Sequence, residues 1–203
     1  FAIPVDRVRI VLNEQLLNPE TFRAWLGFTV AEDAPVVDTV TPWGPAAEAG
    51  MQVGDHIVSI NEQPVSGISS FRIQRIGLQP DRDVLLSTTR KGKVHDLQLH
   101  SWDWVDGLLY EDLGLTVDRY VAGRRPYVRI TKVRPDGPAS EIGLSPGDVV
   151  DAVKPQEGPF SRAWRIIDRA RFASLVRELE EGSALEVDVY RDGERLRGTL
   201  VLD

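Results

Sequence analysis

Two stretches of the chain decide its fold. Residues 44–60 read GPAAEAGMQVGDHIVSI, and residues 137–153 read GPASEIGLSPGDVVDAV. Seven of the 17 aligned positions are identical, and several of the others exchange one apolar residue for another. Self-similarity of this kind indicates that one structural unit occurs twice in the chain.

The repeat extends on both sides of these stretches. LGFTV at residues 26–30 aligns with LGLTV at residues 113–117, and RKG at 90–92 aligns with RDG at 191–193. The offset between the copies rises from 87 to 93 and then to 101 residues, so the second copy carries two insertions. We predict two domains, residues 23–101 and 111–203, joined by a linker at 102–110.

Each copy is predicted to be an α+β domain, a small and partly open antiparallel barrel or sandwich with one longer and one short helix. Short runs rich in β-branched residues predict strands. Lys-Gly at 91–92 and Asp-Gly at 192–193 predict tight hairpins. The longer helices are predicted at 68–76, and from the N-cap Asp168 to Gly182. The short helices are predicted at 45–49 and 138–142.

Composition excludes several classes of function. The 203 residues include 24 basic and 31 acidic ones, and the net charge of −7 argues against a nucleic-acid partner. The chain has no cysteine, and its three histidines do not match a metal-binding spacing, so we expect neither a metal nor a cofactor. No apolar run approaches the roughly 20 residues of a membrane helix, so membrane insertion is not expected.

Three motifs carry a resemblance to a known family: WLGF at 25–28, GPAAEAG at 44–50 and GDHI at 54–57. Together they resemble the tandem PDZ domains of the HtrA family of trypsin-like serine proteases, here without the protease domain. FAIP at 1–4 resembles the segment that closes the protease domain in that family. Since the helical spacing of apolar residues also suits a linker helix, we expect residues 1–22 to be a remnant of the protease C-terminus and a linker helix. The chain begins at Phe1 and not at Met, so we interpret it as a piece of a longer protein.

The resemblance implies a site for the C-terminus of a peptide in the first domain. Backbone N–H groups of Leu26, Gly27 and Phe28 would bind the terminal carboxylate, assisted by the charge of Arg23. The glycine would allow the close approach of the backbone. An apolar side chain of the peptide would enter a pocket with four further residues: Val30, Ile68, Arg72 and Ile76.

The second domain is predicted to have a weaker groove. Its expected residues are Leu113, Gly114, Leu115, Phe172 and Val176. Glu111 and Asp112 stand at the entrance of the loop, where they would repel a carboxylate unless Arg124 or Arg125 folds over them. We therefore hypothesise that the first domain is the better receptor for a free C-terminus.

The resemblance also implies the function of the chain. The chain would be a peptide-binding regulatory region of an HtrA-like endopeptidase. This region would recognise C-termini or extended apolar segments of misfolded proteins by strand addition. Its own protease domain and homo-oligomers of the parent protein are the other implied partners, in the periplasm or cell envelope of a bacterium. The alternative is an oligomer-assembly module with self-occupied grooves. We expect no catalysis by this chain, because no nucleophile and base occur in a triad-like pattern.

Overall fold

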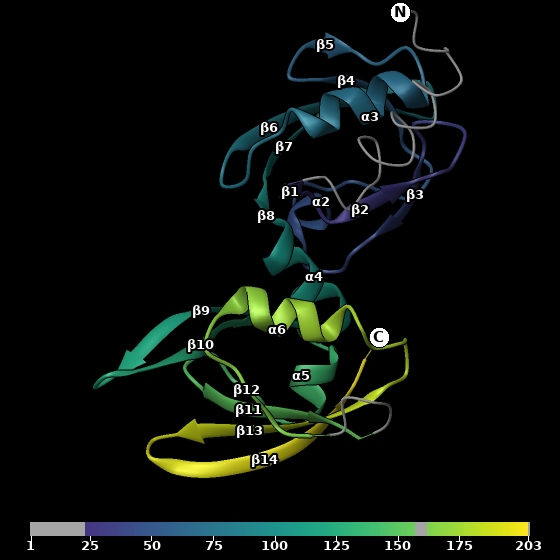
Figure 1. Cartoon of the computed structure of the whole chain (residues 1–203). Helices are drawn as coiled ribbons and strands as arrows, with labels where there is room; N and C mark the ends of the chain where they lie inside the picture. Colours follow the sequence, from purple (N-terminus) through teal and green to yellow (C-terminus); the bar gives the residue numbers. More distant parts are fainter. Residues whose placement is uncertain (1–22, 157–161, 203) are drawn as a thin grey trace, which may run out of the picture. The chain divides into compact units, whose positions relative to one another are not determined.

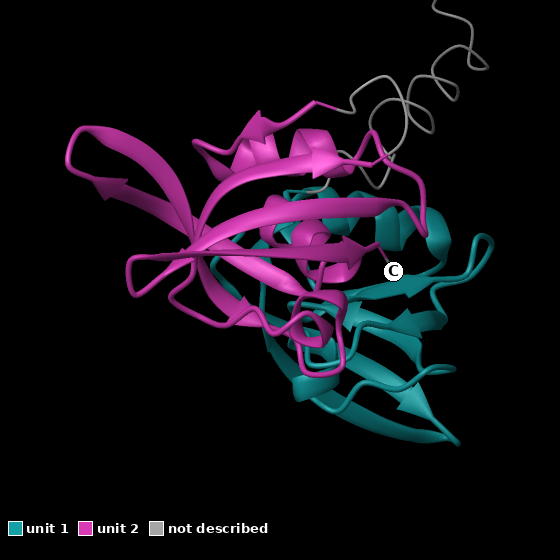
Figure 2. Cartoon of the chain, turned by 90° about the horizontal axis from the view of Figure 1, so that it is seen from below, with its two compact units in different colours: residues 1–104 teal, residues 105–203 magenta. Residues whose placement is uncertain are grey.

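The chain folds into two compact units, which divide after Trp104 (Figure 2). The computed structural model describes residues 23–156 and 162–202. The helix predicted within residues 1–22 therefore lies outside the described residues. Among the described helices, none combines the length and the apolar character needed to span a membrane.

The first unit contains one longer helix, one short helix and eight strands among its described residues. In chain order they are β1 (Ala24–Trp25), β2 (Phe28–Val30), β3 (Val37–Val40), α2 (Pro45–Glu48), β4 (His56–Ile60), β5 (Gln63–Pro64), α3 (Ile68–Ile76), β6 (Asp83–Arg90), β7 (Lys93–His100) and β8 (Trp102–Asp103).

The second unit repeats the order from β2 to β7, has no counterpart of β1 and β8 among its described residues, and begins with an additional helix. Its elements are α4 (Trp104–Asp112), β9 (Leu115–Ala122), β10 (Arg125–Val133), α5 (Pro138–Glu141), β11 (Val149–Pro155), β12 (Trp164–Arg165), α6 (Arg169–Val176), β13 (Ala184–Arg191) and β14 (Glu194–Val201).

The sheets of both units are antiparallel and open (Figure 1). In the first unit a sheet of order β5-β4-β6-β7 is accompanied by the pairs β2-β3 and β1-β8. In the second unit one sheet has the order β14-β13-β11-β10-β9, and β12 pairs with β11. The predicted α+β class is confirmed, with one longer and one short helix in each copy of the repeat; the sheets do not close into a barrel.

The longer helices begin where the sequence predicts. The Asp168 carboxylate accepts a hydrogen bond of 2.7 Å from the backbone N–H of Arg171, so it caps α6. The end of this helix was predicted too late, because α6 ends at Val176 and not near Gly182. Directly after the helix the chain forms a 3₁₀-type turn, in which the N–H of Leu179 donates to the carbonyl of Val176, three residues back.

The first insertion of the second copy lengthens the β9-β10 hairpin. The strands run from Leu115 to Val133 and turn at Gly123, whereas β2 and β3 of the first unit are only three and four residues long. Arg124 and Arg125 lie at the hairpin turn. At about 3.3 Å per strand residue, they are roughly 30 Å along the strand from the loop at 113–115. They therefore do not fold over Glu111 and Asp112.

The segment predicted as a linker has regular structure. Trp102 pairs with Trp25 across β8 and β1, and the two rings lie 5.1 Å apart between centroids. Residues 104–112 form α4, whose Leu109 is fully buried in the core of the second unit. Val105, Leu108 and Leu109 have helical spacing, and this pattern could have predicted the helix.

One ion pair occurs in the same form in both copies. The guanidinium of Arg90 binds the Asp55 carboxylate through Nε at 2.6 Å and Nη2 at 2.7 Å, and Nη2 also donates to the carbonyl of Gly50. Arg191 binds Asp148 in the same way at 2.7 Å and 2.7 Å. This bidentate pair connects the Gly-Asp motif to the hairpin turn that follows β6 or β13, which explains why both motifs recur.

The Asp55 carboxylate is stabilised in its ionised form. Burial opposes ionisation most strongly, but hydrogen bonds from Arg90 and from the backbone N–H of Gln52, with the positive charge of Arg90, outweigh it. The pKa of Asp55 therefore lies below its ordinary value. Its contribution to stability is complete above the unfolded-state pKa of about 3.9 and is lost as the pH falls through the lower folded-state pKa.

We expect Asp55→Asn to destabilise the first unit at neutral pH by about 1–3 kcal/mol, because buried hydrogen bonds are lost. The same substitution should reduce the dependence of stability on pH below about pH 4. Urea unfolding at neutral and acidic pH measures both effects. Asp38→Asn, at an exposed position, is the control. Equal unfolding midpoints for the two variants would contradict this role of the pair.

Candidate functional site

The loop before β2 presents backbone N–H groups to its outer side. The carbonyl of Leu26 accepts a hydrogen bond from the N–H of Ala46 at 3.0 Å, and the carbonyl of Gly27 accepts one from Thr41 at 2.9 Å. In a trans peptide unit the C=O and the following N–H point in opposite directions. The N–H groups of Gly27 and Phe28 are therefore directed away from Ala46 and Thr41.

The second unit has the same arrangement before β9. Its Leu113 carbonyl accepts from Ala139 at 3.0 Å, and its Gly114 carbonyl accepts from Arg134 at 2.7 Å. The N–H groups of Gly114 and Leu115 are consequently turned outward. Both copies of the repeat can thus offer two adjacent donors to an anion.

The short helix of each Gly-Pro-Ala motif holds this loop in place. Gly27 has a φ of 78° and Gly114 a φ of 70°, in the left-handed region that favours glycine. A Cβ on Gly27 would lie 3.1 Å from Cδ of Pro45 and 3.2 Å from the Trp25 ring. A Cβ on Gly114 would lie 3.2 Å from Cα of Gly137. Glycine is therefore required both by backbone conformation and by space.

Strand β2 has one edge that no described strand occupies. Among the described strands it pairs with β3, and the carbonyl of Gly27, the backbone of Thr29 and the N–H of Ala31 are directed to that side. Backbone groups alternate along an antiparallel strand, so those of Phe28 and Val30 face the other edge. Strand β9 is likewise an edge strand among the described residues, with Leu115 and Val117 facing outward along the sheet.

Helix α3 runs along this edge of β2. Near the loop, Arg75 Nη2 lies 3.4 Å from the carbonyl of Ala24, and the rings of Phe28 and Phe71 are 6.3 Å apart. Farther along, Arg72 Nη2 donates to the carbonyl of Glu32 at 3.1 Å. The strand edge and the helix are therefore neighbours, as a groove between them requires. The residues predicted to line it are half-buried and remain accessible: Val30, Ile68, Arg72 and Ile76.

The residues predicted to line a groove in the second unit are placed differently. Three of these predicted residues are buried in the hydrophobic core, with side chains at most 1% exposed: Leu115, Phe172 and Val176. Phe172 and Val176 occupy the positions of Phe71 and Arg75 in the repeat, on the core side of the helix. The equivalents of Ile68, Arg72 and Ile76 are Arg169, Ala173 and Arg177.

The charged residues near the two loops also differ. Arg23 is exposed and precedes β1, and its carbonyl accepts from the backbone N–H of Trp104. In the second unit Arg169, at the start of α6, pairs with Asp106 of α4 at 3.0 Å. Glu111 and Asp112 belong to the last turn of α4, directly before the loop. The second loop is therefore preceded by carboxylates, and the first by a cation.

Comparison with known proteins agrees with this geometry. The sequence pattern of the PDZ domain family matches residues 26–100. A probable periplasmic serine endoprotease, DegP-like, from Pseudomonas putida strain F1 is 28% identical over 230 residues, covering 95% of this chain and 46% of that protein. A DegP-like protein from Halomonas elongata is 25% identical, with 95% and 45% covered. Residues 26–100 thus match the PDZ domain family, and the chain as a whole is similar to DegP-like serine endoproteases.

The chain spans a little under half the length of these curated relatives. A solved serine endoprotease from Yersinia pestis is 27% identical over 51% of this chain and 37% of its own, with a TM-score of 0.35. The similarity in sequence to these relatives covers both units of the chain, whereas the family pattern itself matches the first unit.

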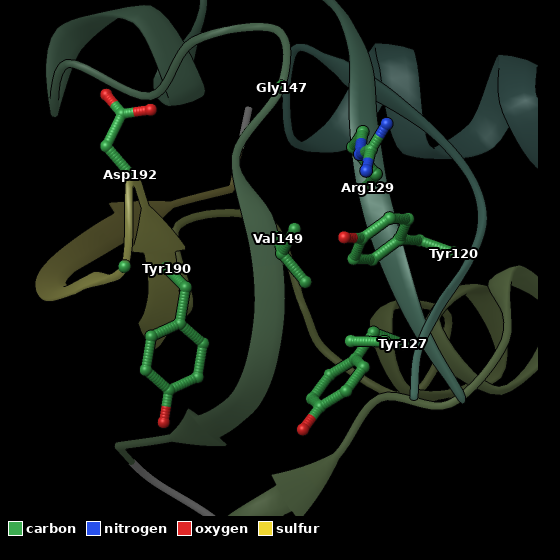
Figure 3. A pocket seen from close by; sticks show the side chains of 9 residues that line it. Tyr120, Tyr127, Arg129, Gly147, Val149, Tyr190 and Asp192 are labelled. Carbon is green, nitrogen blue, oxygen red and sulfur yellow. The ribbon is translucent and has the colours of Figure 1, made fainter. Parts of the chain in front are cut away.

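The second unit has a hollow that sequence analysis did not identify. A cavity of about 370 Å³ lies on the outer face of the sheet in the second unit (Figure 3). Tyr127, Val149 and Tyr190 line it from neighbouring strands, and Arg129 stacks over the Tyr120 ring at 3.7 Å. These residues alternate with core residues such as Val128 and Val150, so the cavity opens on the opposite face of the sheet from the core. The alternation in β10 could have indicated this aromatic surface.

The packing of Gly27 against α2 can be measured by comparison with Gly54. Both glycines have a positive φ, but a Cβ on Gly54 would meet no atom within 4 Å. We expect Gly54→Ala to cost about 1–2 kcal/mol through its backbone conformation, and Gly27→Ala about 1 kcal/mol more through overpacking. Urea unfolding of the first unit measures the difference. Equal costs would show that the loop does not pack closely on Pro45.

Proposed function

We propose that this PDZ region is the peptide-binding part of an HtrA-type serine endopeptidase, and that its first domain captures peptide C-termini. The terminal carboxylate would accept hydrogen bonds from the N–H groups of Gly27 and Phe28. The peptide would then add to β2 as an antiparallel strand, bonding to the backbone of Phe28 and Val30. The observation that carries this proposal is the outward orientation of these N–H groups beside the edge of β2.

The walls of the groove support an apolar C-terminal side chain. Ile68 and Ile76 are half-buried on α3, so an incoming side chain can contact them without a rearrangement of the core. Full burial of a Leu or Val side chain contributes about 1.5–3 kcal/mol. Loss of orientational freedom opposes binding by several kcal/mol. We therefore expect an affinity in the micromolar range.

The second domain is proposed to be the weaker receptor. Its outward N–H groups match those of the first domain, but its apolar residues are already buried in its own core. Glu111 and Asp112 would also repel a carboxylate, by an amount that salt reduces. The difference between the domains thus arises from side chains, because their backbones are alike.

The relatives provide the context for the whole protein. The proteins from Pseudomonas and Halomonas are named probable periplasmic serine endoproteases, DegP-like, and this chain spans a little under half of their length. We propose that the parent protein is likewise a periplasmic protease, whose PDZ region presents damaged proteins to its own protease domain. The parent's oligomers are a further proposed partner of this region.

A charge placed in the first groove tests the proposal. We expect Ile76→Asp to weaken binding of a peptide that ends in a free Val carboxylate by about tenfold or more, because apolar contact is lost. Ile73→Asp is the control, since Ile73 is 60% exposed on the same helix. Isothermal titration of the 203-residue chain measures the affinities. Absence of peptide binding combined with concentration-dependent self-association would favour an assembly module instead.

A further inference from the structure

The β9-β10 hairpin differs in charge from the rest of the chain. Residues 115–133 contain five basic residues and one acidic residue, whereas the whole chain has a net charge of −7. Residues 28–40, the shorter counterpart in the first unit, contain three acidic residues and no basic one. Strand β10 pairs with β11 only at Val128 and Arg129, so the hairpin extends past the rest of the sheet (Figure 1). The second unit therefore has a cationic surface that the first unit lacks.

Two exposed arginines on the outer face of this sheet are held against tyrosine rings. Cζ of Arg129 lies 3.7 Å from the centroid of Tyr120, and Cζ of Arg165 lies 5.2 Å from that of Tyr127. Neither guanidinium forms an ion pair with any residue that the structure describes. A guanidinium stacked on a ring keeps the N–H groups at its own edge available to an anion. Both arginines are therefore held in position as anion donors.

The cavity on this face lies beside Arg129. Tyr127, Val149 and Tyr190 line it, and Tyr190 is 36% exposed. Figure 3 shows Arg129 and Asp192 on opposite sides of Val149, in agreement with the strand order β13-β11-β10. The aromatic hollow thus has a positive end at β10 and a negative end at the β13-β14 turn. A ligand can place an apolar side chain in the hollow and its acidic groups at the β10 end.

The cations of β10 are spread along the strand. Side chains alternate between the two faces of a strand, so Arg125, Tyr127 and Arg129 share the outer face, while Val128 is buried on the other. At about 3.3 Å per residue, the two arginines are separated by roughly 13 Å along the strand, with the tyrosine midway. One small anion cannot contact both. An extended peptide has the same spacing, so acidic residues two positions before and after an apolar residue match this pattern.

We propose that the outer face of the second unit's sheet binds an extended acidic segment of a partner protein, with an apolar or aromatic side chain in the tyrosine hollow. The carboxylates would accept hydrogen bonds from the guanidinium groups of Arg125 and Arg129. Charge complementarity selects this occupant, because the arginines have the required spacing and are held as donors. The surface is distinct from the groove beside β2 and needs no free C-terminus, so it does not depend on the proposed function of the first domain.

The test titrates the full chain with the peptide Glu-Ala-Phe-Ala-Glu, acetylated at its N-terminus and amidated at its C-terminus. Blocked ends remove the terminal carboxylate that the first groove would bind. We expect the backbone amide NMR signals of Tyr127, Arg129, Val149 and Tyr190 to shift in low salt, at peptide concentrations up to about 1 mM. A peptide with lysine in place of glutamate should not bind. Alanine in place of phenylalanine should weaken binding by about fivefold.

Variants locate the binding surface. We expect Arg129→Gln to weaken binding by about fivefold or more, because a charge-assisted hydrogen bond is lost. Arg119→Gln is the matched control in the same hairpin, since Arg119 pairs with Val128 and so lies on the opposite face; it should weaken binding less than about twofold. Tyr190→Ala should weaken the phenylalanine peptide and leave the affinity of the alanine peptide unchanged. The NMR spectra check that each variant is folded.

Several results would overturn the proposal. Equal weakening by Arg119→Gln and Arg129→Gln would indicate non-specific attraction of negative charge to the hairpin. A wild-type chain that does not bind the acidic peptide would refute the proposal directly. Binding of phosphatidylglycerol vesicles that Arg129→Gln abolishes would then assign this face to a lipid surface. Self-association in light scattering that the same variant abolishes would assign it to a second copy of the chain.

Discussion

The proposed binding site depends on the orientation of two peptide units. The carbonyl groups of Leu26 and Gly27 are held by the N–H groups of Ala46 and Thr41, and this constraint turns the N–H groups of Gly27 and Phe28 outward. The left-handed φ of Gly27 and its close approach to Pro45 maintain the orientation. The recurrent Gly-Pro-Ala segment is thus part of the candidate site, although it would not contact a ligand.

The two units share the interactions that stabilise the fold and differ in the side chains around the loop. In each unit an Arg-Asp pair connects the Gly-Asp strand entry to a hairpin turn, with nearly the same distances in both copies. The backbone of the loop is also repeated, including its two inward carbonyl bonds. What differs is the set of side chains around it, with Arg75 in one copy and Val176 in the other. Divergence at such positions can change the ligand without a change of fold.

Much of the fold follows from short-range patterns in the sequence. The repeat, the hairpin turns at Lys91-Gly92 and Asp192-Gly193, and the cap at Asp168 are local signals, and the structure confirms them. Helix α4 was missed because its tryptophan-rich start was interpreted as a connection. The direction of side chains on α6 was harder to predict, since it depends on how the helix rotates against the sheet. Phe172 and Val176 have the spacing of one helix face, but that face packs into the core.

Amide hydrogen exchange of the full chain, with and without a peptide that has a free C-terminus, tests the central claim most directly. The account predicts that the amides of Gly27, Phe28 and Val30 exchange freely in the unbound chain and slow when the peptide binds, while those of Leu115 and Val117 change less. Slow exchange at Gly27 and Phe28 before any peptide is added would show that these donors are already occupied. No slowing in the first domain on binding would place the peptide elsewhere and contradict the account.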